Sequence, residues 1–178
     1  MSEDWSERRW AILCFVIFVV GMIIGSQAKA PLPPPEIGKS SNLEVVFTGL
    51  EQKVIQRIYS ANNTIYIAAN IITNPNIATA LLGAKGRAVN VTIIIEEENA
   101  IGSGTQIQAL QKELRVILDI GAGRLLDTFM IIDSRVVVTG TYQWTTEPNT
   151  GDLVIIRDPR MAQAYFAQWN YIYETRRR

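Results

Sequence analysis

One residue type that often does chemistry in proteins is missing from this chain of 178 residues. The sequence contains no histidine, which removes the commonest general base, the commonest metal ligand and the side chain that titrates near neutral pH. A polar set remains between residues 124 and 143: Arg124, Thr128, Asp133, Thr141 and Gln143. These side chains offer hydrogen bonds and one positive charge, which suits the binding of a polar ligand.

The spacing of this set resembles the signature of the phospholipase D superfamily. That signature reads His-x-Lys, four residues, Asp, six residues and Gly-Ser-x-Asn, often followed by Trp-Thr. Several positions match in register or carry a related residue: Asp133, Gly140, Trp144 and Thr145, with Thr141 for the serine and Gln143 for the asparagine. The resemblance covers most of residues 43–173. It is closest to the small single-motif members, which include bacterial endonucleases and mitochondrial membrane-anchored relatives.

The departures from the signature fall on the residues that carry the family's chemistry. In the family the histidine attacks phosphorus and the lysine neutralises phosphate oxygens, but Leu126 and Thr128 stand at these positions. Leucine has no lone pair to donate, and threonine brings no positive charge. Gly151-Asp152 stands where the family often has Glu-Asn before the late strand. The resemblance therefore implies a scaffold that keeps Asp133 but lacks the nucleophile.

Side chains next to the motif are interpreted as structural. If a strand runs through the motif, Leu126 and Thr128 share one face and Asp127 points to the other, as a solvated or capping carboxylate. Tyr142 is expected to be a packed aromatic side chain. Arg124 has two interpretations: a surface salt bridge, or a cation that faces the pocket and holds a phosphate.

No metal or cofactor site is predicted. Glu96-Glu97-Glu98 follow a buried strand and are interpreted as a solvated loop. The single cysteine, Cys14, lies in an apolar segment and provides neither an intrachain disulfide nor a cysteine-based zinc site. Basic and acidic residues number 17 each, so the net charge does not favour a nucleic-acid partner, although a local patch remains open.

Three segments are predicted to precede the domain. Residues 1–9 are short and polar, residues 10–28 form a transmembrane anchor around the uncharged run Trp10–Gly25, and residues 29–42 form a proline-rich linker.

The alternative to a retained anchor is a removed signal peptide, since Ala28-Lys29-Ala30 resembles a cleavage site. Pro31 follows directly and disfavours cleavage, because proline lacks an amide hydrogen and has a restricted φ. Arg8-Arg9 before the span favours an inside N-terminus, which places the domain on the exported side of the membrane.

Residues 43–178 alternate predicted strands and helices. The predicted strands are 43–48, 64–70, 89–95, 129–132, 136–139 and 153–156; the predicted helices are 50–59, Asn76 to about 83–86, 105–114 and Pro159 onwards. The strand 89–95 is almost wholly apolar, so we expect it to be central and buried on both faces. The alternation predicts an α/β domain with a mixed β-sheet flanked by helices.

Together these features predict a single-pass membrane protein. Its phospholipase-D-like domain is catalytically degenerate and is predicted to act as a binding or assembly module. The resemblance implies a homodimer, because single-motif members of the family pair with their motifs facing each other; a heteromer with another phospholipase-D-like or membrane protein is the variant. The predicted pocket residues are Asp133, Gly140, Thr141, Gln143 and Arg124. Two alternatives stay open: a phosphodiesterase with an altered active site, and a non-catalytic nucleic-acid-binding protein.

Overall fold

The computed structural model describes residues 41–146 and 151–177, together with five exposed helical positions nearer the N-terminus: Trp10, Leu13, Phe15, Val16 and Phe18. The predicted anchor (10–28) and linker (29–42) therefore lie largely outside the described residues. In the part that is described, no helix combines the length and hydropathy needed to cross a membrane. The chain divides into two units, residues 1–34 and 35–178, and the second holds the sheet and its helices.

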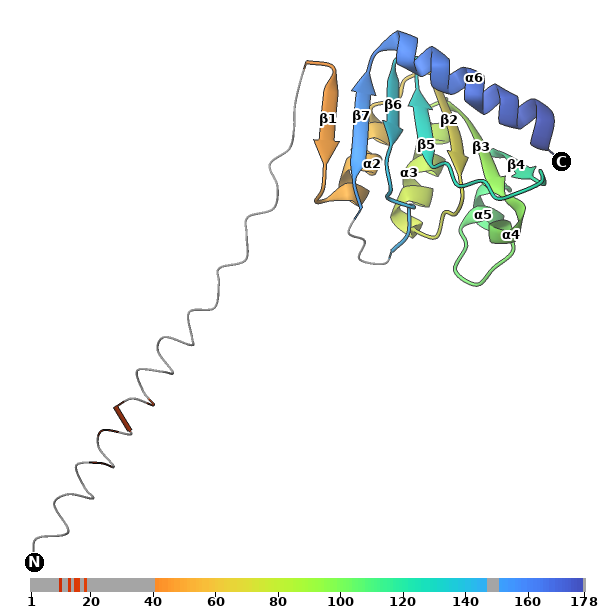
Figure 1. Ribbon diagram of the computed structural model, residues 1–178. Helices are drawn as coiled ribbons and strands as arrows, with labels where there is room; N and C mark the ends of the chain where they lie inside the picture. The colour runs from red at the N-terminus through yellow and green to blue at the C-terminus, as the bar shows by residue number, and fades with distance from the viewer. Residues whose placement is uncertain are drawn as a thin grey trace, which may run out of the picture. The chain divides into compact units, whose positions relative to one another are not determined.

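Seven strands form one mixed sheet (Figure 1). In sheet order they are β1 (Leu43–Val46), β7 (Leu153–Arg157), β6 (Val136–Thr139), β5 (Phe129–Ile132), β2 (Thr64–Ala69), β3 (Asn90–Glu96) and β4 (Arg115–Asp119). Strands β2, β3 and β4 run parallel, and every other neighbouring pair is antiparallel. We call the edge where β2, β3 and β4 end the carboxyl edge, and the edge where they begin the amino edge.

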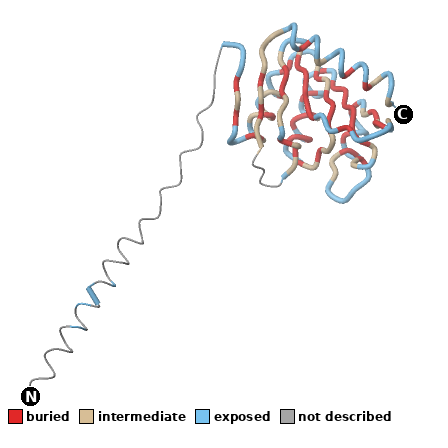
Figure 2. Tube along the Cα trace, viewed as in Figure 1, coloured by how far each residue is buried: buried red, intermediate tan, exposed pale blue. Residues whose placement is uncertain are grey.

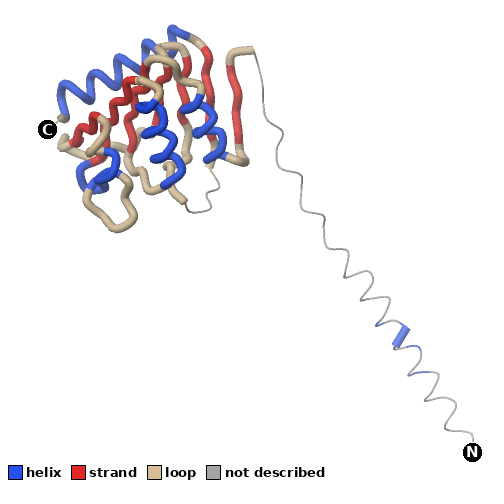
Figure 3. Tube along the Cα trace, turned by 180° about the vertical axis from the view of Figure 1, so that it is seen from behind, coloured by secondary structure: helices blue, strands red, loops and turns tan. Residues whose placement is uncertain are grey.

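Helices cover both faces of this sheet. Helices α2 (Leu50–Tyr59) and α3 (Pro75–Gly86) lie on one face, seen from behind in Figure 3, and α6 (Pro159–Arg176) crosses the other face in Figure 1. Two short helices, α4 (Glu97–Ala100) and α5 (Ile107–Leu110), lie between β3 and β4 in the chain. The predicted α/β domain with a mixed sheet between helical layers is confirmed.

Apolar side chains fill the space on each side of the sheet, where the buried parts of the chain concentrate in Figure 2. Along β3, Ile93 belongs to the core under α2 and α3, whereas Ile94 belongs to the core under α6. The expectation that this strand is buried on both faces is therefore confirmed. Trp169 anchors α6 by donating a hydrogen bond from its indole N–H to the carbonyl of Ile67, at 2.8 Å.

Two predicted elements differ from the structure. The segment 105–114 is helical only from Ile107 to Leu110, and the chain then extends into β4, which the sequence pattern does not predict. Strand β4 is a five-residue edge strand that pairs with β3 and meets Arg177 only at Asp119, and its alternation is too brief to separate it from a helix end.

The cap of α3 also differs from the prediction. Asn74, and not Asn76, caps the helix: its side-chain oxygen accepts hydrogen bonds from the amides of Asn76 and Ile77, at 2.9 and 3.2 Å. Pro75 then occupies the first helical position, where its missing amide hydrogen has no partner to lose. The proline therefore fixes the helix start two residues earlier than predicted.

Candidate functional site

The register of the sheet places the degenerate motif, apart from Asp133, at the carboxyl edge. Phe129, the first residue of β5, pairs with Ala68 near the end of β2 and with Thr139 at the end of β6. Three segments therefore meet at this edge: residues 124–128, 140–143 and 151–152. In open α/β sheets this is the edge at which ligands bind.

The backbone of Leu125 is held from both sides. Its amide donates a hydrogen bond to the carboxylate of Glu96, and its carbonyl accepts one from Asn70 Nδ2 at 2.8 Å. Asn99 Nδ2 donates in turn to the carbonyl of Asn70 at 2.9 Å. Glu96, predicted to lie in a solvated loop, is 7% exposed and is part of this clamp. The segment that carries the motif is therefore fixed by long-range hydrogen bonds.

The two positions that hold the catalytic pair in the family behave differently from each other. Leu126 is 73% exposed, whereas Thr128 is 5% exposed and donates a hydrogen bond from its hydroxyl to Gln143 Oε1 at 3.2 Å. The prediction that they share a strand face is wrong, because β5 begins only at Phe129 and the alternation does not reach back to residue 126. Asp127, predicted to point away, instead lines a pocket beside Thr128.

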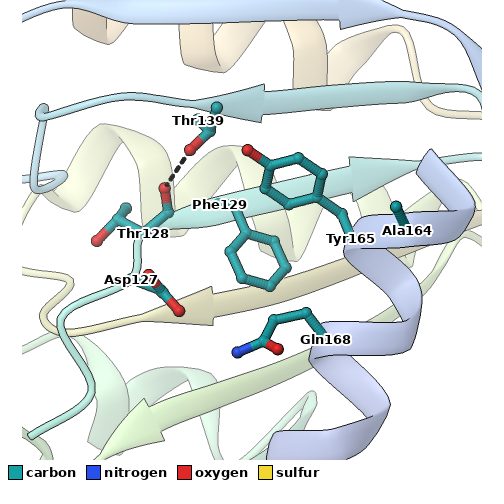
Figure 4. Close-up of a pocket in the computed structure, with 7 residues that line it drawn as sticks. All are labelled: Asp127, Thr128, Phe129, Thr139, Ala164, Tyr165 and Gln168. Carbon is teal, nitrogen blue, oxygen red and sulfur yellow. Dashed lines mark hydrogen bonds between the residues drawn. The ribbon is translucent and has the colours of Figure 1, made fainter. Parts of the chain in front are cut away.

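That pocket lies between the motif and α6 and has a volume of about 290 Å³ (Figure 4). Its lining residues are Asp127, Thr128, Phe129, Thr139, Ala164, Tyr165 and Gln168. The rings of Phe129 and Tyr165 meet edge to face at 5.1 Å, and the Thr139 hydroxyl donates to the carbonyl of Thr128 at 3.3 Å. Among the lining residues that the structure describes, Asp127 alone carries a charge, so the pocket does not attract phosphate.

The sequence patterns do not predict the pocket residues that α6 contributes, Tyr165 and Gln168. Tyr165 is expected only as part of an apolar helix face, and Gln168 belongs to no motif. They lie 20 and 23 residues after Thr145, where the motif ends, and a helical period cannot tell which strand the helix will cross.

Thr141 is engaged by Asp152 across the edge. Its hydroxyl donates to Asp152 Oδ1 at 2.5 Å and accepts from the Asp152 amide at 3.0 Å. Gly140 makes this approach possible: it has a φ of 139°, and a Cβ there would overlap the carbonyl oxygen of Asp152. A carboxylate therefore does lie beside the motif, but its bonds to Thr141 already occupy it.

Asp133 does not line a pocket with Thr128 and Gln143, contrary to the prediction. It lies at the opposite end of β5, at the amino edge, where its carboxylate accepts hydrogen bonds from the amides of Asn62, Asn63 and Thr64 at 2.9, 2.8 and 2.9 Å. Because β5 is four residues long, its two ends face opposite edges of the sheet. This aspartate is thus a structural residue that fixes the start of β2.

Hydrogen bonding controls the titration of Asp133. Burial alone would raise its pKa, but the bonds from the amides of Thr64, Asn62 and Asn63 outweigh that effect and hold the pKa below its ordinary value of 3.8. A lowered pKa in the folded state gives stability that is present at neutral pH and is lost as the pH falls through the folded-state value.

We expect Asp133→Asn to lower the free energy of unfolding by about 2 kcal/mol at pH 7, because it replaces charge-assisted acceptors with a neutral amide. Asparagine tolerates the left-handed backbone at this position (φ 49°), so the turn itself is retained. Urea unfolding at pH 7 measures the loss. Asp127→Asn, at an exposed carboxylate, is the control and should change stability by less than about 0.5 kcal/mol; equal losses would contradict the role of Asp133.

Arg124 forms the surface salt bridge that was one of its two interpretations. Its guanidinium lies 3.4 Å from Glu98, and each of the two side chains is 72% exposed. It is not among the residues that line the pocket beside Asp127. Within residues 41–146 and 151–177, no group of three or more cysteine or carboxylate side chains converges as a metal site would.

Comparison with known proteins agrees with this geometry. Residues 54–172 match the family described as "Cardiolipin synthase, PLD-like domain". A phospholipase D from Rickettsia prowazekii is 29% identical over 136 residues, which cover 72% of this chain and 66% of that protein, so the chain spans about two thirds of that relative. The mouse mitochondrial cardiolipin hydrolase is 24% identical over 166 residues, covering 89% of this chain and 75% of that protein.

Among solved structures, the phospholipase D family member Nuc from Salmonella typhimurium superposes with a TM-score of 0.69 and 25% identity. The match covers 80% of this chain and 97% of Nuc. The chain therefore belongs to the phospholipase-D-like family of phosphodiesterase folds.

Proposed function

We propose that the protein is a membrane-anchored phospholipase-D-like module without catalytic activity. Its domain lies on the exported side of the membrane and assembles with a second copy of the chain through the carboxyl edge. The observation that carries this proposal is Leu126. At the position where the family places its nucleophile, an aliphatic side chain stands 73% exposed on a segment whose backbone is clamped.

Three facts argue against the family's phosphoryl transfer. The sequence has no histidine, so the phosphohistidine route is closed. The hydroxyl of Thr128 points to Gln143, and the nearby pocket carries a carboxylate and no cation among its described lining. Loss of a covalent nucleophile typically lowers the rate by many orders of magnitude, and a negative pocket adds repulsion of a phosphodiester.

The same edge has the features of a pairing surface. Ile101 lies there directly after α4 and Ile120 directly after β4, and they are 76% and 47% exposed. Together with Leu126 they give this edge exposed apolar side chains among charged ones, and exposed apolar surface is typical of a protein interface. A two-fold axis would bring two such groups together, and cyclic dimers are the commonest assemblies.

The first test is activity. The purified full chain should show no turnover of a fluorogenic phosphodiester above buffer, and Leu126→Ala and Thr128→Ala should leave that baseline unchanged. The variant Leu126→His with Thr128→Lys restores the family's residue types and shows whether the scaffold still supports them. Turnover by the unmodified chain that Thr128→Ala abolishes would overturn the proposal.

The second test is assembly. We expect the full chain in detergent to sediment as a dimer, and Leu126→Asp to raise the dimer dissociation constant by at least about tenfold, because a buried carboxylate would face an apolar partner. Tyr171→Asp, at a 61% exposed position on the outer side of α6, is the matched control and should leave the constant unchanged. A monomeric wild-type chain, or equal effects of both variants, would refute pairing through this edge.

A further inference from the structure

Although its net charge is zero, the domain separates its exposed charges between the two edges of the sheet. Exposed basic side chains gather at the amino edge, where α2 and α3 end and where β3, β4 and β6 begin: Lys85, Arg87, Lys112, Arg115, Arg135 and Arg160. We call these six residues the basic edge. Composition alone hides this arrangement, because acidic residues elsewhere cancel it.

The acidic side chains at the same edge do not cancel the basic edge. Glu113 pairs with Lys85 at 2.6 Å, and Asp158 pairs with Arg160 at 3.1 Å while also capping α6. The carboxylate of Asp133 is bound by three backbone amides. The basic edge thus keeps a positive excess of six cations over these three carboxylates, and within the described residues neither Arg135 nor Lys112 forms a salt bridge.

The carboxyl edge has the opposite charge. Glu97, Glu98, Asp119, Asp127 and Asp152 lie there with three arginines: Arg124, Arg176 and Arg177. Arg124 pairs with Glu98 and Arg176 with Asp119, so a negative excess remains. A phosphate-rich surface would therefore attract one end of the domain and repel the other.

The chain also enters the domain at the basic edge. Leu43 opens β1 opposite Ile156, near the end of β7, and the amide of Arg157 donates to the carbonyl of Asn42 at 2.7 Å. The predicted linker 29–42 therefore joins the domain at this edge. Tyr59, 58% exposed with Arg87 over its ring at 5.5 Å, adds an amphipathic side chain of the kind that settles at a membrane–water interface.

We propose that the basic edge docks on the anionic lipid surface of the membrane that holds the anchor. Two features favour lipid as the occupant: the charge of this edge, and the entry of the chain there from the predicted linker. Docking there turns the carboxyl edge, with Leu126, away from the bilayer. The inference uses the predicted anchor of the proposed function, but it does not depend on pairing through Leu126.

The test reports the orientation of the domain in the full chain. With Cys14 replaced by serine, a dye is attached through Gln56→Cys, on α2 towards the amino edge, or through Ser103→Cys, in the loop at the carboxyl edge. Each labelled chain is reconstituted into phosphatidylcholine vesicles, with or without phosphatidylglycerol, that carry an acceptor dye on a lipid headgroup. Energy transfer then measures which edge approaches the bilayer.

We expect transfer from position 56 to rise when phosphatidylglycerol is added and to fall again at high salt, where the screening length shrinks to about 3 Å. Transfer from position 103 should stay low. Arg135→Glu with Lys112→Glu should lower the ratio of docked to free domain by at least about tenfold. The control variant, Arg124→Glu with Arg177→Glu, makes the same change of charge away from the basic edge. In this variant energy transfer from position 56 should still rise with phosphatidylglycerol.

A rise in energy transfer of the same size from position 103 would overturn the proposal. So would an equal loss of the rise from position 56 in both charge variants. Tighter binding of a single-stranded DNA oligonucleotide than of phosphatidylglycerol would assign the basic edge to nucleic acid instead. Sedimentation of the Arg135→Glu, Lys112→Glu chain separates the two proposals: it should still dimerise, so loss of docking and loss of pairing are distinguishable.

Discussion

Replacing Glu44 with glutamine is expected to lower the free energy of unfolding by about 3 kcal/mol at pH 7. Glu44 lies on β1 and is 3% exposed. Its carboxylate is 2.7 Å from Lys53 Nζ, 3.3 Å from Arg57 and 2.6 Å from Arg157. The amide of glutamine fits the same space but removes the charge that offsets three neighbouring cations, and an unbalanced buried charge is strongly destabilising.

The size of this effect follows from the pKa of Glu44. The hydrogen bond from Lys53 lowers that pKa most, burial opposes it, and the bond from Arg157 lowers it further, so that it falls from its ordinary value of 4.5 to about 2. A pKa difference of one between the folded and unfolded states corresponds to about 1.4 kcal/mol of stability. The stabilisation is complete above the unfolded-state pKa and disappears as the pH falls through the folded-state value.

The difference in stability between wild type and Glu44→Gln should therefore be constant near neutrality and shrink between about pH 5 and pH 2. Denaturant unfolding at a series of pH values measures it. The control is Glu98→Gln. Glu98 pairs with Arg124 where both side chains are 72% exposed, so this change should alter stability by less than about 0.5 kcal/mol. A difference below about 1 kcal/mol at pH 7, or one that does not vary with pH, would contradict the role of the network.

The hairpin of β5 and β6 shows how far the sequence predicts this fold. The apolar runs 129–132 and 136–139 predict the two strands, and Asp133 and Ser134 between them adopt the positive φ that a tight hairpin turn requires, 49° and 53°. Local chemistry decides these features, so a local pattern reveals them.

What the sequence does not predict depends on contacts between distant segments. The role of Asp133 requires the amides of residues 62–64 to lie next to it, about 70 positions away in the chain. The burial of Glu96 and Glu44 depends in the same way on partners from other strands and helices. Periodicity assigns a side chain to a face, but only the strand order decides which loop that face meets.

The sequence mispredicts the candidate site for a related reason. Strand alternation predicts the faces of Leu126 and Asp127, yet the hydrogen bonds on the backbone of Leu125 hold this segment outside the strand. Only three-dimensional contacts show that Asp127 shares a pocket with Tyr165 and Gln168.

Trp144 secures the segment that carries Gln143. It is 1% exposed, and its carbonyl accepts hydrogen bonds from the amides of Thr73 and Asn74 at 3.3 and 3.0 Å. The buried side chain of Asn74 donates in turn to the carbonyl of Thr145 at 3.3 Å. The indole and these bonds together fix residues 142–145 against the start of α3.

Trp144→Ala is expected to lower the free energy of unfolding by about 4 kcal/mol, because it empties a fully enclosed site that its neighbours can only partly fill. Trp144→Phe keeps an aromatic ring there and should lose less. Denaturant unfolding at neutral pH measures both; a loss below about 1 kcal/mol for the alanine variant would contradict the anchoring role.

The backbone of Trp144 provides a second, independent outcome. Its φ of 58° lies in the left-handed region, which is strained for a residue with a Cβ. Glycine relieves that strain, so Trp144→Gly should be more stable than Trp144→Ala by about 1 kcal/mol, the reverse of the order in a strand or helix. If the two variants instead follow that usual order, the segment relaxes once the indole is gone, and the hydrogen bonds to Thr73 and Asn74 do not hold the turn by themselves.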